Sequence, residues 1–131
     1  LLKNTILKDQ VIKNINFSNT DMELINFEFA NLNNVIIKKS SLKGSNFKSS
    51  KLLEVSITDS NMEGVVLTNS KIENSVLTNV NFKGANIENV NFKNVDLTNS
   101  ILVGVNMINT VFESVKFCNT IMPSGIRSDN C

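Results

Sequence analysis

The sequence contains no histidine, tryptophan or tyrosine, and only one proline. Histidine is the commonest general acid–base group and the commonest metal ligand, so its absence removes the usual centre of an enzyme or metal site. The sequence also lacks any run of about 18 apolar residues, the length that a membrane-spanning helix requires. We therefore expect a protein with no enzymatic activity, no metal, no cofactor and no membrane span.

An excess of charge of either sign is also missing. Thirteen basic and 12 acidic residues give a formal net charge of +1. A nucleic-acid-binding surface needs a basic stripe, and a protein that imitates DNA needs a strongly acidic surface. The composition therefore predicts that nucleic acid is not a partner and argues against DNA mimicry.

Large apolar residues are present at every fifth position. From Leu2 to Met122, all 25 positions at this spacing hold Leu, Ile, Met or Phe. Two residues before each of them is a second column, mostly of Ala, Ser, Thr and Val. Because residues two apart point to the same side of an extended chain, both columns face a common core. A period of five fits neither a helix nor a long strand, and predicts a short extended segment followed by a tight turn.

The remaining two positions of each unit form the turn. The second of them is Asn, Gly or Asp in 18 of 25 units. These residues tolerate the positive φ that a type II turn requires at its second central position. Four glycines at this position recur every 20 residues, which indicates four units in each coil. These turn glycines are Gly44, Gly64, Gly84 and Gly104.

Two further features follow the same spacing. The residues that precede this turn column alternate in charge and predict a ladder between neighbouring coils. They are Glu23, Lys43, Glu63 and Lys83. The first two coils depart from the repeat, and there we expect a bulge or an altered corner. The departures are Gln10, Ile15, Leu24, Ile25 and Phe29.

Two units show the repeat most clearly, Ala85-Asn86-Ile87-Glu88-Asn89 and Val90-Asn91-Phe92-Lys93-Asn94. They resemble the pentapeptide-repeat family, and the resemblance covers residues 1–122. It implies an all-β fold, the right-handed quadrilateral β-helix, with about six coils of four pentapeptides. It also implies a structural or protein-binding scaffold without chemistry. Some members of the family bind DNA gyrase by imitating DNA, which is the alternative function.

The end of the chain carries a narrower resemblance. The segment Phe117-Cys118-Asn119-Thr120-Ile121-Met122-Pro123-Ser124-Gly125, with the final Cys131, is similar to the closing segment of cyanobacterial and plastid members. The resemblance implies that residues 123–131 form a capping tail held by a disulfide between Cys118 and Cys131. Two free thiols or a reactive redox pair are the alternatives. It further implies a plastid or thylakoid lumen, or another oxidising extracytoplasmic compartment. Because the chain begins at Leu1 and not at Met, we expect a processed or trimmed form.

Apolar residues occupy outward positions in the last two coils, where most outward positions elsewhere are polar. They are Ile101, Val103, Ile108, Val111 and Ile121. Either the folded-back tail covers them, with Ile126, or they form a surface for a partner or for self-association. Leu1, Ile6 and Val11 also point outward, at the other end. We therefore expect a protein partner of unknown identity, and a monomer or a weak dimer formed through the solenoid ends.

Overall fold

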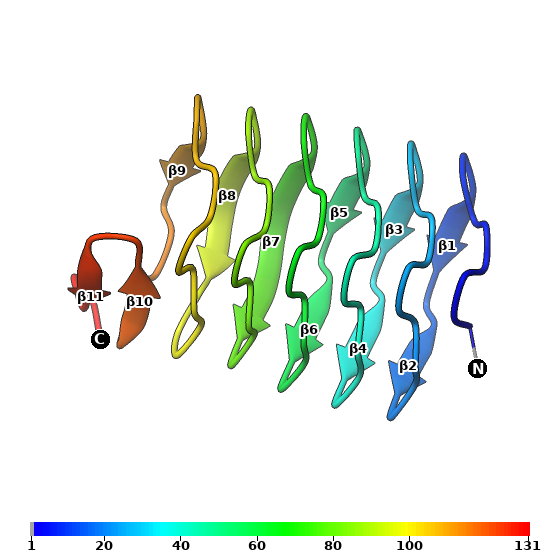
Figure 1. Ribbon diagram of the computed structural model, residues 1–131, viewed down its shortest axis with the longest axis horizontal. Helices are drawn as coiled ribbons and strands as arrows, with labels where there is room; N and C mark the ends of the chain where they lie inside the picture. The colour runs from blue at the N-terminus through cyan, green and yellow to red at the C-terminus, as the bar shows by residue number, and fades with distance from the viewer. Residues whose placement is uncertain (1) are drawn as a thin grey trace.

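The computed structural model describes residues 2–131, so Leu1 lies outside the described part of the chain. The chain winds into coils that stack side by side along one axis, with the termini at opposite ends (Figure 1). No helix occurs among the described residues. The predicted all-β fold, a right-handed quadrilateral β-solenoid, is therefore confirmed.

The strands are short because a corner interrupts the extended backbone every five residues. Parallel pairing joins nine of them into one sheet, and the last two form a separate antiparallel pair. The strands are β1 (Val11–Lys13), β2 (Asn16–Ser18), β3 (Asn31–Asn33), β4 (Ile36–Lys38), β5 (Lys51–Leu53), β6 (Ser56–Thr58), β7 (Lys71–Thr78), β8 (Asn91–Asp96), β9 (Val111–Glu113), β10 (Thr120–Met122) and β11 (Gly125–Arg127).

Every parallel pairing joins residues 20 apart, so each coil contains four units, as the glycine spacing predicts. β1 pairs with β3 in this register, and the same face continues through β5, β7 and β8 to β9. These pairings join six levels through five 20-residue turns, so the number of turns is one smaller than the six coils expected.

We number the four sides of the rod. Face 1 contains the bridges from Asp21 through Ser41 to Ile121, and face 2 those from Ile6 through Asn26 to Asn106. Face 3 contains β1, β3, β5 and β9, and face 4 contains β2, β4 and β6; β7 and β8 run across both of these faces.

The second turn residue has the same backbone conformation at every corner along the rod. The second turn residue has a positive φ at every fifth position from Asn4 to Asn119, and φ is 64–69° at the four turn glycines. Leu24 and Phe29 adopt the same conformation, with φ of 57° and 59°. The expected irregularity in the first coils is therefore wrong. Their backbone N–H groups donate to the carbonyls of Lys43 and Lys48 in the next coil, at 3.0 and 2.9 Å, and this ladder imposes the corner on residues that disfavour it.

The two inward columns form one continuous core. Large side chains such as Phe27, Phe47 and Phe82 are almost completely buried. Equivalent residues of successive coils stack on one another, as the rings of Phe27 and Phe47 do with centroids 4.9 Å apart. Ile25, which departs from the small column, is fully buried. Burying a Leu, Ile or Phe side chain contributes about 1.5–3 kcal/mol, so the stacked core is the main stabilising term.

Serine in the small column has two different environments. Ser75 lies at a corner without the closing backbone hydrogen bond, and its hydroxyl donates to the carbonyl of Glu73 at 2.8 Å. The same hydroxyl accepts from the N–H of Val55 in the previous coil, at 3.0 Å. Ser45 follows a corner that its own N–H closes by donating to the carbonyl of Leu42, at 3.0 Å. The Ser45 hydroxyl is buried and has no hydrogen-bond partner among the described residues.

This difference predicts opposite responses to the same substitution. Ser75→Ala leaves the buried N–H of Val55 without an acceptor and should lower the free energy of unfolding by about 1–3 kcal/mol. Ser45→Ala removes an unsatisfied hydroxyl and should leave stability unchanged or raise it; Ala85 already occupies the same column. Urea unfolding followed by circular dichroism measures both. Equal destabilisation by the two variants would contradict the proposed role of Ser75.

Corner asparagines form a hydrogen-bonded column between faces 3 and 4. The amide of Asn34 donates to Asn14 at 2.7 Å, and that of Asn94 donates to Asn74 at 2.9 Å. Glu54 lies between these two pairs, with a φ of 54°. A glutamate at this position interrupts the amide column and disfavours the left-handed conformation more than asparagine does.

We predict that Glu54→Asn raises the free energy of unfolding by about 1 kcal/mol, because Asn fits the left-handed corner and continues the column. Thermal unfolding and urea unfolding both test this. Glu54→Gln is the control, since it removes the charge but keeps a long side chain. If Gln stabilises as much as Asn, the effect comes from the charge and not from the corner.

Candidate functional site

The described residues offer few places for chemistry. They contain no group of three or more Cys, Asp or Glu arranged to hold a metal ion. Residues 2–131 also contain no helix that is both long enough and apolar enough to cross a membrane. Five of the outward apolar residues predicted from the sequence and both cysteines lie toward the C-terminal end of the rod, which is the candidate site. Ile6 and Val11, also predicted to point outward, are exposed at the other end.

The tail turns back beside the last coil (Figure 1). β11 pairs antiparallel with β10, placing Ile126 opposite Ile121, and the turn between the strands contains Pro123. Cys118 and Cys131 form a disulfide, with their Cα atoms 4.8 Å apart. The predicted disulfide is therefore present, and the described residues include no free cysteine.

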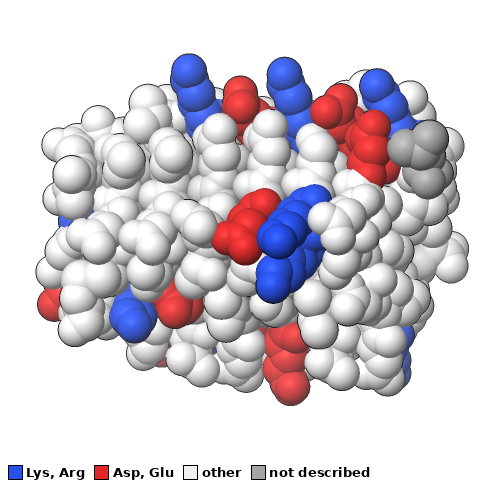
Figure 2. All heavy atoms as spheres, turned by 90° about the horizontal axis from the view of Figure 1, so that it is seen from below, with Lys and Arg blue, Asp and Glu red and all other residues white. Residues whose placement is uncertain are grey.

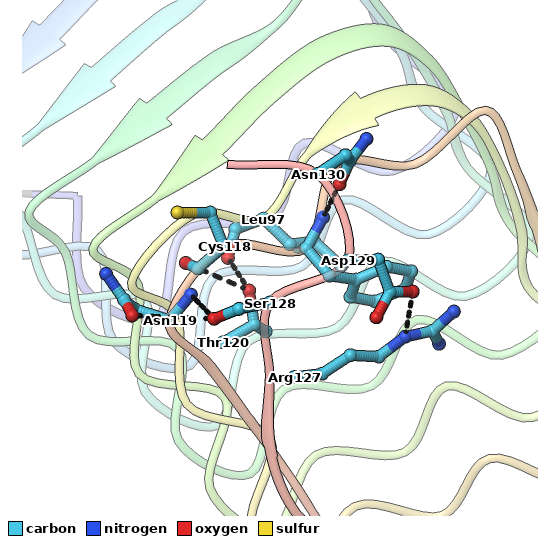
Figure 3. Close-up of polar contacts among 9 residues, drawn as sticks. Leu97, Cys118, Asn119, Thr120, Arg127, Ser128, Asp129 and Asn130 are labelled. Carbon is cyan, nitrogen blue, oxygen red and sulfur yellow. Dashed lines mark hydrogen bonds and ion pairs between the residues drawn. The ribbon is translucent and has the colours of Figure 1, made fainter.

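Polar side chains of the tail take the place of a further coil (Figure 3). In the previous coil, the N–H groups of Leu97 and Asn99 donate to carbonyls 19 residues later, both at 2.9 Å. The equivalent N–H groups, of Phe117 and Asn119, have no such coil to donate to. The Asn130 side-chain oxygen accepts from Phe117 N at 3.0 Å, and the Ser128 hydroxyl accepts from Asn119 N at 2.8 Å. Two donors at the end of the solenoid are thereby satisfied.

Arg127 covers part of the apolar end of the core. Its guanidinium lies 3.8 Å from the centre of the Phe117 ring, a cation–π arrangement. Asp129 holds the guanidinium in place, with 2.6 Å between Nε and the Asp129 carboxylate oxygen. Thr120 anchors the start of the tail, because its buried hydroxyl donates to the carbonyl of Leu97 at 2.8 Å.

The tail leaves the other half of this end open. Met107 and Phe112 are only partly buried, and with Met122, Pro123 and Ile126 they line a hollow between the last coil and the tail. β9 pairs only with β8, so its outer edge carries no strand in the described chain.

The five outward apolar residues divide into two groups. Ile101 and Ile121 stack on each other on face 1 and are half-buried. Val103, Ile108 and Val111 lie on the last level and are 41%, 59% and 52% exposed, respectively. β11 pairs with the strand that contains Ile121, and Val103, Ile108 and Val111 remain accessible.

Sequence reasoning missed several contributors to this end, including Arg127 and Asp129. Ser128 and Asn130 follow no repeat, so only the folded-back tail reveals that they accept backbone N–H groups. Met107 and Phe112 belong to the column of core residues and carry no outward signal. The available signal was their place in the last coil. Because no further coil covers them, these core residues either need a cap or become exposed.

Comparison with known proteins identifies the family. Residues 12–48, 60–99 and 91–122 match the family of pentapeptide repeats, with eight copies, and together span well over half of the chain. The repeats, corners and stacked core are those of a β-solenoid built from five-residue units. The chain belongs to the pentapeptide-repeat family. No match was found among curated protein sequences.

Two solved structures share the fold. A pentapeptide repeat protein from the thylakoid lumen of Arabidopsis thaliana is 20% identical, with a TM-score of 0.61 over 86% of this chain and 65% of that protein. The chain therefore spans about two thirds of the length of the Arabidopsis protein. QnrB1, a plasmid-mediated fluoroquinolone resistance protein, is 8% identical, with a TM-score of 0.63 over 86% of this chain and 74% of that one. At these identities the similarity concerns the fold alone.

The disulfide yields a prediction on stability. Cys131→Ser should lower the free energy of unfolding by about 3 kcal/mol under non-reducing conditions, because the bond closes a loop of about 14 residues. Thermal unfolding measures the difference. The control is the same pair of proteins with reducing agent, where the difference should vanish. Equal melting temperatures without reductant would contradict a stabilising role for the bond.

Proposed function

We propose that this protein is a non-enzymatic scaffold that binds a protein partner through the C-terminal end of the rod. The observation that carries this proposal is a change in two surface columns. The column that ends at Val103 and the column that ends at Ile108 are otherwise almost entirely charged. Their earlier members are Lys3, Glu23, Lys43, Glu63 and Lys83, and Lys8, Glu28, Lys48, Thr68 and Glu88. On the last level both columns become apolar, and both side chains are exposed.

The open edge of β9 supports the same location. An extended segment of a partner can add a strand to a free sheet edge, where main-chain hydrogen bonds give affinity. Beside this edge, the hollow lined by Met107 and Phe112 can receive an apolar side chain of such a segment. Val111, on β9 itself, is 52% exposed and would contact the same partner.

The shape of the rod supports a role without catalysis. Enzymes place reacting groups in a cleft that excludes water, whereas the faces of this rod consist of short strand segments whose outward residues are mostly polar. The acidic residues of the charged columns alternate with lysines along the surface. In the open groove that Glu23 and Glu63 both line, Lys43 lies on the level between the two carboxylates.

The disulfide indicates the kind of cellular compartment in which the protein works. Disulfides persist in oxidising compartments and are rare in the cytosol. We infer from the Cys118–Cys131 bond that the protein works in an oxidising extracytoplasmic compartment. A plastid or thylakoid lumen is the specific proposal, suggested by the closing segment and by the lumenal origin of the Arabidopsis relative.

The alternative function, gyrase binding by DNA mimicry, gains no support from the surface. A DNA mimic presents a continuous row of negative charge. Here acidic and basic side chains alternate along the edge of the rod (Figure 2), and the net charge is +1. We therefore favour the scaffold.

The proposal predicts that Ile108→Lys abolishes partner capture, because it places a charge in the centre of the exposed apolar group. Thr68→Lys, in the same column two levels earlier, is the matched control and should bind as the unmodified protein does. Immobilised proteins are incubated with an extract of the native compartment, and captured proteins are quantified by mass spectrometry. Partners that persist on Ile108→Lys, or that are lost equally from both variants, would overturn the proposed surface.

A further inference from the structure

One edge of the rod carries an alternating row of charges. Its side chains lie at the corner between faces 1 and 2, one on each level, so neighbours are about 4.8 Å apart. Figure 2 shows this alternation along one edge. We call it the charge row, and its members are Lys3, Glu23, Lys43, Glu63 and Lys83.

The acidic members of the charge row are held in position by face 1. The hydroxyl of Ser41 donates to one carboxylate oxygen of Glu23 at 3.1 Å. The amide of Asn81 donates to the carboxylate of Glu63 at 3.2 Å. The glutamates therefore present fixed negative charges, and the lysines between them present positive ones.

Most of these charges are not neutralised within the chain. The Nζ atom of Lys3 lies 3.9 Å from Oε1 of Glu23, and both side chains remain partly exposed. Among residues 2–131, no other ion pair within 4 Å involves a member of the charge row. The row lies beside a shallow groove whose floor contains Gly44 and Gly64, where the corner carries no side chain.

We propose that two copies of this chain associate side by side and antiparallel through the charge row and face 2. The two-fold axis passes between the levels of Glu23 and Lys43, perpendicular to the rods. Glu23 of each copy then lies opposite Lys43 of the other. On the flanking levels, Lys3 lies opposite Glu63. Each of the four cross-pairs joins opposite charges.

The alternation also selects against other arrangements. If the two rods shared face 2 in parallel, the charge row would lie opposite the column of Lys8, Glu28 and Lys48 on the other edge of this face. On the first three levels Lys would then face Lys or Glu would face Glu, and like charges would repel. Moving the axis by half a level gives the same result, because it places Lys opposite Lys or Glu opposite Glu. The pattern is therefore self-complementary in the antiparallel arrangement, as an isologous two-fold interface requires.

Neighbouring columns agree with this register. A second charged column, which contains Lys8, Glu28 and Lys48, lies at the corner between faces 2 and 3. In the proposed arrangement, Glu28 lies opposite Lys48 of the second copy. Moving the axis by one whole level toward the C-terminus would instead place Glu28 opposite Glu88. With the axis between the Glu23 and Lys43 levels, neither charged column places like charges opposite each other.

Face 2 itself is complementary in the same register. Ile6, which is 73% exposed, lies opposite Val66 of the second copy, and Asn26 lies opposite Asn46. Leu24 is 56% exposed, and its side chain reaches from its own level over Gly44 on the next. It therefore lies close to the proposed axis and meets its counterpart there. Apolar side chains face apolar ones, and amides face amides.

The contact strip covers four levels, about 15–20 Å of rod. A stable interface usually buries about 800 Å² on each partner, and this strip is narrower. The dimer should therefore be weak, detectable at high protein concentration, and weakened further by salt, which screens exposed charges.

A charge-exchange experiment tests the arrangement by sedimentation velocity at about millimolar concentration in low salt. Lys43→Glu places a second carboxylate opposite Glu23, and Glu23→Lys places a second ammonium group opposite Lys43. Each variant alone should therefore associate at least tenfold more weakly than the unmodified protein. An equimolar mixture of the two variants restores opposite charges at all four cross-pairs and should form a heterodimer. Lys51→Glu on face 3 makes the same charge change outside the strip and should leave association unchanged.

Three results would overturn the proposal. The first is an unmodified protein that stays monomeric at this concentration. The second is dimerisation that Lys43→Glu leaves intact, which would indicate association through the solenoid ends instead. The third is a mixture of the two variants that associates no better than either alone. Circular dichroism of each variant confirms that the solenoid is folded before the comparison.

Discussion

Every fifth residue adopts a left-handed backbone conformation, and the rest of the structure depends on this corner. It turns the chain by one side of a square after each short extended segment. Four corners return the chain to its starting side, one strand spacing further along the rod. Backbone N–H and C=O groups then meet those of the neighbouring coils, and the same columns of side chains are buried on every level. The ladder holds even Leu24 and Phe29 in this conformation.

Against this regular backbone, residues of the same type differ in the hydrogen bonds that they make. At corners closed by a backbone hydrogen bond, the small column needs only a residue that fits, and Ala85 and Ser45 serve equally. At some open corners a serine hydroxyl links two coils, as Ser75 does, while others hold valine, as at Val55. Two residues of the same type in the same kind of column therefore differ in importance, and only the hydrogen-bond pattern distinguishes them.

A solenoid satisfies its interior coils automatically and leaves its ends unsatisfied. At the C-terminal end, the tail supplies Ser128 and Asn130 as acceptors and Arg127 as a lid on Phe117. It covers only part of the end, and the uncovered part has apolar side chains around a free strand edge. At this end, the requirements of stability and of partner binding therefore conflict. A complete cap would satisfy the remaining backbone groups and would also remove the surface on which the proposed partner binds.

The sequence by itself determined the five-residue period and the four-sided coil, because both depend on spacing along the chain. The disulfide was implied by the resemblance of the closing segment to other family members. The small column and the turn glycines follow from the same spacing. Only the tertiary structure decided that the first coils are regular, since the neighbouring coil's hydrogen bonds outweigh the local preferences of Leu24 and Phe29. The tertiary structure also decided which apolar residues stay exposed, because the path of the non-repetitive tail determines whether Val103, Ile108 and Val111 are covered.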